Sequence, residues 1–343
     1  MKGLELSEKY FEAYGRQMLA EQFPEVMPYV AVGLFGSGSE CFGFDDDISR
    51  DHDFEPGFCI FLPGEEVVDR RTAFLLERAY AKLPQEFSGM SRSRLAPVGG
   101  ARHGVFRTRE FFAEKIGPVA ERLLGEDGVL SGAERLRGET VDIFSPEKRR
   151  EAIETDDWFL IPETALAEAT NGRIFLDPYG EVTNLREALS FYPENVRKKK
   201  LAGHLLLMAQ AGQYNYARCL SHGETAAAQL AVFEFVKSAM AVLFLLNRVY
   251  QPFYKWSFKA LRALPKLSLE AELLAYLLTS DNEAYAAEEK QAVIEGIAAD
   301  VIDELNEQGL TKAICQDLEK HAYSVNDGIA DATLRNRHIL VGV

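Results

Sequence analysis

Cysteine, tryptophan and long apolar runs are scarce in this chain of 343 residues. The longest strongly apolar run, Ser238–Asn247, has half the length that a membrane span needs. An N-terminal apolar segment typical of a signal peptide is also missing. The four cysteines form no C-x-x-C pair, so neither a disulfide scaffold nor a zinc site is expected. We therefore expect a cytoplasmic protein with reduced thiols and no membrane segment.

Positively charged residues are also few relative to negatively charged ones. The chain has 38 Lys and Arg against 53 Asp and Glu, a formal net charge of −15. A general nucleic-acid binder needs a basic surface to replace counterions along the phosphates, so this class of partner is not expected. A small phosphorylated ligand remains compatible, because a bound metal ion can neutralise its charge locally. Apolar residues make up 47% of the chain, which is enough for a packed core.

Two halves differ in their hydrophobic patterns. The first half alternates short apolar runs with amphipathic stretches, whereas long helical patterns follow Val182. In the second half, Ser221 and Glu224 have the spacing of a capping box, which predicts a helix from there to about Tyr250. Residues 117–157 give no readable pattern. The predicted strands are Tyr29–Phe35, His52–Leu62, Val105–Thr108 and Arg173–Leu176, and the predicted helices of the first half include Leu6–Phe23, Val67–Ala81 and Phe111–Ile116.

These patterns predict an α+β fold with a small mixed β-sheet domain at residues 1–182 and an all-α helical domain at residues 183–343. The strand that ends at Phe35 leads directly into Gly36–Ser39, a Gly-Ser-Gly-Ser turn. Such a turn leaves backbone N–H groups free without bulky side chains nearby, which favours binding of phosphate oxygens. The lysine pattern of a P-loop is missing.

A pair of aspartates follows this turn. Asp51 and Asp53 are separated by one residue, so on a strand both side chains would share one face. Two adjacent carboxylates repel unless a cation lies between them, and Mg²⁺ prefers oxygen ligands together with substrate phosphates. We therefore interpret Asp51 and Asp53 as metal ligands. The neighbouring triplet Asp45–Asp47 is interpreted as a set of simple loop acids, and His52 as structural.

The segment Gly36–Phe54, with Gly-Ser followed by thirteen residues and Asp-x-Asp, resembles the signature of the polymerase-beta-type nucleotidyltransferase superfamily. In its wider sequence it resembles a bacterial nucleotidyltransferase-like family that is catalogued as a domain of unknown function. Three later stretches, Ala169–Phe175, Gln213–Cys219 and Leu246–Trp256, also resemble that family. Residues 117–157 look like an expansion relative to it.

The resemblance implies a Mg²⁺-dependent (or Mn²⁺-dependent) nucleotidyltransferase, similar to aminoglycoside nucleotidyltransferases. Such an enzyme moves a nucleoside monophosphate, here expected to be AMP, from an NTP to an acceptor hydroxyl and releases pyrophosphate. ATP is the expected donor, and a small molecule or a protein is the expected acceptor. Asp51 and Asp53 would be the catalytic metal ligands, and the residues expected to bind the nucleotide are Gly36, Ser37, Gly38, Ser39, Lys237 and Lys255.

The superfamily usually supplies a third carboxylate from a later strand, and the strand Val105–Thr108 has no acid. The candidates are Glu110, Asp142 and Asp177, and none matches the pattern well. This keeps open a nucleotide-binding or regulatory protein with impaired catalysis. Two structural alternatives also remain open. Lys237 can pair with Glu234 on a helix surface, and the protein can be a helical scaffold or interaction protein in which the α/β half is inert.

Overall fold

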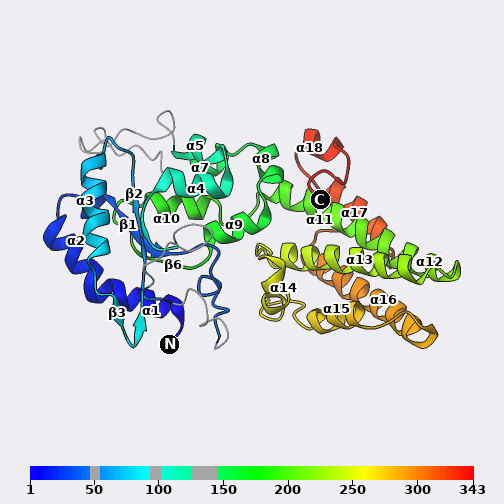
Figure 1. Ribbon diagram of the computed structural model, residues 1–343. Coiled ribbons are helices and arrows are strands. Elements are labelled where there is room, and N and C mark those ends of the chain that lie inside the picture. Colours follow the sequence, from blue (N-terminus) through cyan, green and yellow to red (C-terminus); the bar gives the residue numbers. More distant parts are fainter. Residues whose placement is uncertain (47–54, 93–101, 125–144) are drawn as a thin grey trace. The chain divides into compact units, whose positions relative to one another are not determined.

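The computed structural model describes residues 1–46, 55–92, 102–124 and 145–343. They form two compact units, each of which is considered by itself (Figure 1). The first, the sheet unit, comprises Met1–Asp157 and Ala165–Ser190, and the second, the helical unit, comprises Trp158–Thr164 and Phe191–Val343. A four-stranded mixed sheet in the first unit and helices throughout the second confirm the predicted fold class.

The sheet has the strand order β5-β2-β1-β6. Strand β1 is antiparallel to both β2 and β6, whereas β2 and β5 run parallel. Strand β6 has its predicted bounds, but the predicted strand His52–Leu62 is shorter, because residues 55–58 lie outside any strand. The observed bounds are Ala31–Leu34 for β1, Cys59–Leu62 for β2, Gly104–Arg107 for β5 and Arg173–Leu176 for β6.

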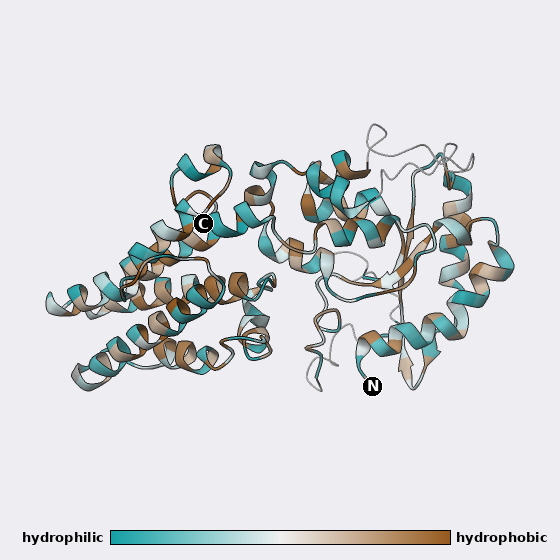
Figure 2. Ribbon diagram, turned by 180° about the vertical axis from the view of Figure 1, so that it is seen from behind, coloured by the Kyte–Doolittle hydropathy of each residue, from teal (hydrophilic) through white to brown (hydrophobic). Residues whose placement is uncertain are grey.

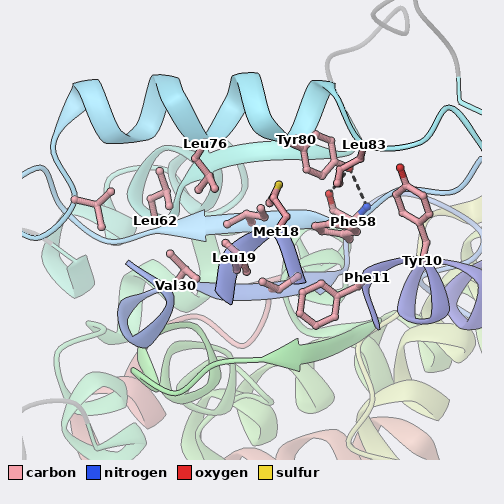
Figure 3. Packing of buried hydrophobic residues seen from close by; sticks show 13 residues of the cluster. Tyr10, Phe11, Met18, Leu19, Val30, Phe58, Leu62, Leu76, Tyr80 and Leu83 are labelled. Atoms are coloured by element: carbon pink, nitrogen blue, oxygen red, sulfur yellow. Dashed lines mark hydrogen bonds between the residues drawn. The ribbon is translucent and has the colours of Figure 1, made fainter. Parts of the chain in front are cut away.

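One face of the sheet is covered by the N-terminal helices and by α3 (Arg70–Ala81) (Figure 3). The hydroxyl of Tyr80 donates to the carbonyl oxygen of Phe58 at 2.8 Å and accepts from its N–H at 3.1 Å, so α3 is tied to the chain entering β2. The expected single N-terminal helix is α1 (Gly3–Tyr10), a π-helical turn (Phe11–Gly15) and α2 (Arg16–Gln22).

The opposite face carries a cluster of phenylalanines. Phe35 stacks on Phe61 of β2 with ring centroids 4.7 Å apart, and both meet Phe111 edge-on at 5.2 and 5.0 Å. Phe111 belongs to α4 (Thr108–Ile116). These contacts place α4 against the sheet from the side opposite to α3, and they give each sheet face its own apolar layer.

The remaining elements of the sheet unit surround this core. Arg150 donates to the carbonyl oxygens of Glu187 and Ala188 at the end of α10, so part of the basic run at residues 148–150 has a structural partner. The bounds are Met27–Tyr29 for the 3₁₀ helix, Glu86–Phe87 and Met90–Ser91 for the hairpin β3–β4, Val119–Leu124 for α5, Pro146–Glu151 for α7, and Glu181–Ala188 for α10. Helices α8 (Thr155–Leu160) and α9 (Glu163–Thr170) contribute to both units.

Helices α11 to α18 build the helical unit, and α13 is its most apolar helix (Figure 2). By length and composition α13 could cross a membrane, but two thirds of its most apolar window are buried inside the structure. This confirms that the run Ser238–Asn247 belongs to a core helix. The bounds are Glu194–Met208 for α11, Ala217–Ser221 for α12, Thr225–Leu246 for α13, Tyr254–Leu261 for α14, Glu270–Thr279 for α15, Ala284–Glu307 for α16, Leu318–Asp327 for α17 and Ala332–Asn336 for α18, with a π-helical segment at Ala209–Tyr216.

The predicted capping box at Ser221 is wrong. Ser221 is the last residue of α12, and its hydroxyl donates to the carbonyl oxygen of Arg218 at 2.8 Å. The N-cap position of α13 is Glu224, which makes no capping hydrogen bond with its side chain. The hydroxyl is used within the preceding helix, where a local serine–carbonyl bond competes with capping.

A carboxyl pair gives the helical unit a pH-dependent stability. Glu270 at the start of α15 is buried, and burial together with the neighbouring Asp300 raises its pKa to about 7. The raised pKa means that the folded chain holds this proton more tightly than the unfolded chain does. The contribution to stability is therefore complete below about pH 4.5 and is lost as the pH rises toward about 7.

We predict that Glu270→Gln removes this loss. At pH 8 the variant should unfold with a free energy higher by roughly 1–2 kcal/mol, since water near the exposed Asp300 screens part of the repulsion. Urea denaturation at pH 5 and pH 8 measures the difference. Glu272→Gln, which replaces an exposed glutamate of the same helix, is the control and should keep the wild-type pH dependence. Equal pH dependence of wild type and Glu270→Gln would contradict the assignment.

Candidate functional site

The Gly-Ser turn (Gly36–Ser39) follows β1 and is held by one amide side chain. Asn171 accepts a hydrogen bond from the Gly36 N–H at 2.9 Å and donates one to the Gly36 carbonyl oxygen at 2.7 Å. Gly36 has φ +134°, a conformation that side chains with a Cβ rarely adopt. The predicted turn is therefore present. Its backbone at Gly36 is held in one orientation by Asn171, which lies 135 residues later in the sequence.

Gly172 brings this amide to the turn. It has φ +63°, and a Cβ there would collide with the carbonyl oxygen of Leu34 and lie 2.8 Å from the Cα of Phe35. Its N–H donates to the carbonyl oxygen of Cys41 at 2.8 Å. Only glycine permits so close an approach of the two backbones, so the Asn-Gly pair is built against the end of β1.

Arg186 of α10 supports the same loop from behind. Its guanidinium donates to the carbonyl oxygens of Ala169 at 3.1 Å and Thr170 at 2.8 Å, and also to that of Asn171. It lies over the ring of Phe35 at 4.4 Å. Burial lowers the pKa of Arg186 to about 10, so the side chain stays charged at neutral pH.

A cation that sequence reasoning missed lies beside the turn. Lys115 is near the end of α4, and its ammonium group would be 3.9 Å from a Cβ placed on Gly36. Its Nζ forms an ion pair with Glu168 of α9 at 2.8 Å and lies 5.2 Å from the ring centre of Phe111. The Lys115 side chain is only 15% exposed, so this charge is positioned and not free in solvent.

The strand topology brings further polar groups to the edge of the sheet at which β1 ends and the turn begins. Because β1 ends where the antiparallel β2 and β6 begin, and β5 is parallel to β2, the residues before these three strands share the edge with the turn. Glu55, ahead of β2, lies 3.4 Å from the imidazole Nδ1 of His103, ahead of β5. The carboxylate of Glu40 folds over Gly38. The edge therefore combines the turn, one ammonium group and several carboxylates.

Asp45 is a buried acid with a structural partner, and not the simple loop acid that was expected. Its carboxylate accepts a hydrogen bond from the N–H of Gly3 at 2.9 Å, at the start of α1, and lies 3.5 Å from the ammonium group of Lys2. A carboxylate at a helix N-terminus stabilises the free N–H groups and the positive end of the dipole. Asp45 is 4% exposed and is used in folding.

The predicted metal ligands Asp51 and Asp53 lie outside the described residues, as do the third-acid candidate Asp142 and His52. In the ranges that the structure describes, no group of three or more His, Cys, Asp or Glu side chains could hold a metal ion. The buried thiols at this edge do not favour a soft metal, because burial raises the pKa of Cys41 and that of Cys59, the latter to about 12.

The other two third-acid candidates lie away from the turn. Asp177 follows β6 at the opposite edge of the sheet and accepts hydrogen bonds from the N–H groups of Gly180 and Thr183 at 2.8 and 2.7 Å. Glu110 is exposed in the first turn of α4, which begins at the end of β5 and so at that opposite edge. Neither acid is brought to Gly36.

Lys237 and Lys255 belong to the helical unit. Lys237 is exposed on α13, and among the described residues it makes no ion pair with Glu234. Lys255 is exposed on α14, with its ammonium group 4.8 Å from the ring centre of Trp256. The structure leaves both as surface cations.

Comparison with known proteins gives one match. A family model described as a domain of unknown function (DUF4037) matches residues 158–257. This range includes the three stretches of family resemblance from Ala169 to Trp256 and begins after the Gly-Ser turn. No curated protein and no solved structure gives a significant match.

We predict that Asn171→Ala destabilises the chain by about 1–3 kcal/mol, because the Gly36 N–H and carbonyl oxygen lose their partner in a part-buried place. Urea denaturation at neutral pH measures this loss. Asn306→Ala, which removes an exposed amide on α16, is the matched control and should change stability by less than about 0.5 kcal/mol. Equal stability of both variants would show that the Asn171 bonds do not hold the turn.

Proposed function

We propose that the chain is a Mg²⁺-dependent nucleotidyltransferase that moves a nucleoside monophosphate, AMP in the first instance, from an NTP to an acceptor hydroxyl with release of pyrophosphate. The observation that carries the proposal is the Gly-Ser turn at the end of β1, fixed by Asn171 and flanked by the ammonium group of Lys115. Backbone N–H groups and a partly buried cation are what phosphate oxygens require.

The aspartates complete the proposed site. Glu55 and Gly57 lead into β2 at the edge of the turn, and Asp51 and Asp53 precede them in sequence. Mg²⁺ held by these two carboxylates would neutralise charge that develops on the phosphates. An oxygen-preferring ion suits this edge, where the described acidic side chains are carboxylates and the thiols are buried.

In this proposal the residues of the chain act mainly by holding the triphosphate in position. The turn N–H groups and Lys115 would hold the triphosphate, and Arg186 and Asn171 would keep the turn in place. Glu168 would release Lys115 in part as phosphate oxygens accept hydrogen bonds from its ammonium group. The proposed acceptor is the hydroxyl of a small molecule or a protein, and the proposed location is the cytoplasm.

One observation favours a second candidate, a nucleotide-binding protein with impaired turnover. Among the described residues, neither Glu110 nor Asp177 lies at the edge of the turn to supply a third carboxylate. Both candidates require NTP binding at the same place. Only the first requires pyrophosphate release, which an assay over a panel of hydroxyl acceptors can detect.

We predict that Asp51→Asn with Asp53→Asn lowers pyrophosphate release from ATP by at least about 100-fold, because the phosphates lose their counter-charge. Asp47→Asn, an acid of the same sequence segment, is the control and should retain activity. Transfer that survives the double substitution would exclude this mechanism. Absence of Mg²⁺-dependent NTP binding to the wild type, measured by calorimetry, would exclude both candidates.

We predict that Lys115→Met weakens NTP binding by about tenfold or more, because a charge-assisted contact to phosphate is lost. Lys115→Arg should restore part of the affinity. Glu168→Gln removes the other half of the ion pair and should leave NTP affinity equal or higher, since Lys115 then has no competing partner. If Lys115→Met and Glu168→Gln changed only stability, and to the same extent, the pair would be purely structural.

A further inference from the structure

The helical unit contains a polar cluster that the proposed nucleotide site does not use. It lies between the segment Trp158–Thr164 and the start of α11. Trp158 and Tyr192 are 1% and 2% exposed, and their rings meet edge-on with centroids 5.9 Å apart. Lys200 of α11 is buried too, and its ammonium group lies 5.2 Å from the ring centre of Tyr192.

Polar atoms in this cluster have no hydrogen-bond partner among the described residues. They are the indole Nε1 of Trp158, the hydroxyl of Tyr192 and the Nδ1 of His204. His204 follows Lys200 by one helical turn on α11, so the two side chains share a face. An unsatisfied buried polar atom costs about 1–3 kcal/mol, and a group of them in one place of a natural protein calls for a partner.

Two opposite charges border the cluster without forming an ion pair. Glu163 bonds the residue that follows Tyr250, and the ring of Tyr250 meets that of Tyr192 edge-on with centroids 5.0 Å apart. Glu163 accepts a hydrogen bond from the N–H of Gln251 at 2.9 Å, and Lys200 donates to the carbonyl oxygen of Gly342 at 2.9 Å. The carboxylate raises the pKa of Lys200, against the larger lowering by burial, so each charge acts on the other. In the described part of the chain, however, no Glu163–Lys200 contact within 4.0 Å occurs, and each charge keeps only this one hydrogen bond.

The donors gather at the positive end. Lys200 has two further N–H bonds to give, and Trp158 can only donate. Burial and the neighbouring lysines Lys200 and Lys237 lower the pKa of His204 to about 3, so its ring is neutral at physiological pH. The negative end has the carboxylate of Glu163 with one oxygen uncommitted. A ligand that matches this pattern is negative at one end and positive at the other.

We propose that Trp158, Tyr192, Lys200 and Glu163 form a binding site for a small zwitterion of the α-amino acid type. The ligand carboxylate accepts hydrogen bonds from Lys200, Trp158 and Tyr192, and the ligand ammonium group is paired with Glu163. A free anion would be repelled by Glu163, and a free cation by Lys200. This site is independent of the nucleotide site, and all of its residues belong to the helical unit and to the range that the family model matches.

The test is calorimetry of the full chain at neutral pH with each of the twenty proteinogenic L-amino acids, and with acetate and methylammonium as ligands of one charge. At least one amino acid should bind in the millimolar range or tighter, and the two single-charge ions at least about tenfold more weakly. Absence of binding by every amino acid, or equal binding of acetate, would overturn the proposal.

Two conservative variants test the assignment of the residues. Tyr192→Phe removes only the hydroxyl, whereas Trp158→Phe removes the indole N–H together with part of the ring. Each should weaken amino-acid binding by about fivefold or more. Tyr323→Phe, which alters a half-exposed tyrosine of α17, is the matched control and should bind normally.

A stability measurement separates a ligand site from a structural water site. Without ligand, Tyr192→Phe should unfold at the same temperature as the wild type or higher, because it removes an unsatisfied polar atom and leaves the ring in place. If Tyr192→Phe unfolded at lower temperature and both variants bound amino acids as the wild type does, the hydroxyl would be satisfied inside the fold, and the proposal would be wrong.

Discussion

The pair of hydrogen bonds between Asn171 and Gly36 is the constraint on which the sheet unit's polar edge depends. A primary amide can donate and accept at once, so one side chain fixes both the N–H and the carbonyl oxygen of the same residue. Gly172 allows the two backbones to touch, and Arg186 fastens the loop that carries the amide. If the turn binds phosphate, as proposed, it needs this rigidity, since mobile N–H groups would lose entropy whenever a ligand ordered them.

The helical unit contains a different device, a run of four basic residues of which three are buried. Four consecutive basic residues of α11, Arg197–Lys200, each donate to at least one backbone carbonyl oxygen, and these carbonyls come from Leu245 and from the segment Gly328–Gly342. Burying a charge is costly unless hydrogen bonds replace its water. Arg197 also pairs with Glu194, whereas the ammonium group of Lys200 bonds a carbonyl oxygen and forms no ion pair with Glu163 among the described residues.

Local sequence predicted the elements whose limits are set by local chemistry. The apolar run Arg173–Leu176 predicted the bounds of β6, and the Gly-Ser turn was placed correctly at the end of β1. Contacts between distant parts of the chain determine the features that the sequence did not predict. The N-terminal helix includes a π-helical turn, at whose last residue, Gly15, a Cβ would lie 2.5 Å from the ring of Phe58. Ser221 closes one helix instead of opening the next, because its hydroxyl has a nearer carbonyl acceptor.

The candidate site shows the same division. A Gly-Ser turn and an Asp-x-Asp pair are contiguous in sequence and can be recognised there, whereas Lys115 looks like any lysine near the end of a helix. It reaches the turn because β5 runs parallel to β2 and α4 then returns along the sheet, so the helix's last residues come back to the edge that the strand left. The same path carries Glu110 to the opposite edge. The path of the chain from β5 through α4 therefore brings Lys115 to the candidate site and places Glu110 away from it. Catalytic turnover in the proposed mechanism then depends on the carboxylates that precede β2.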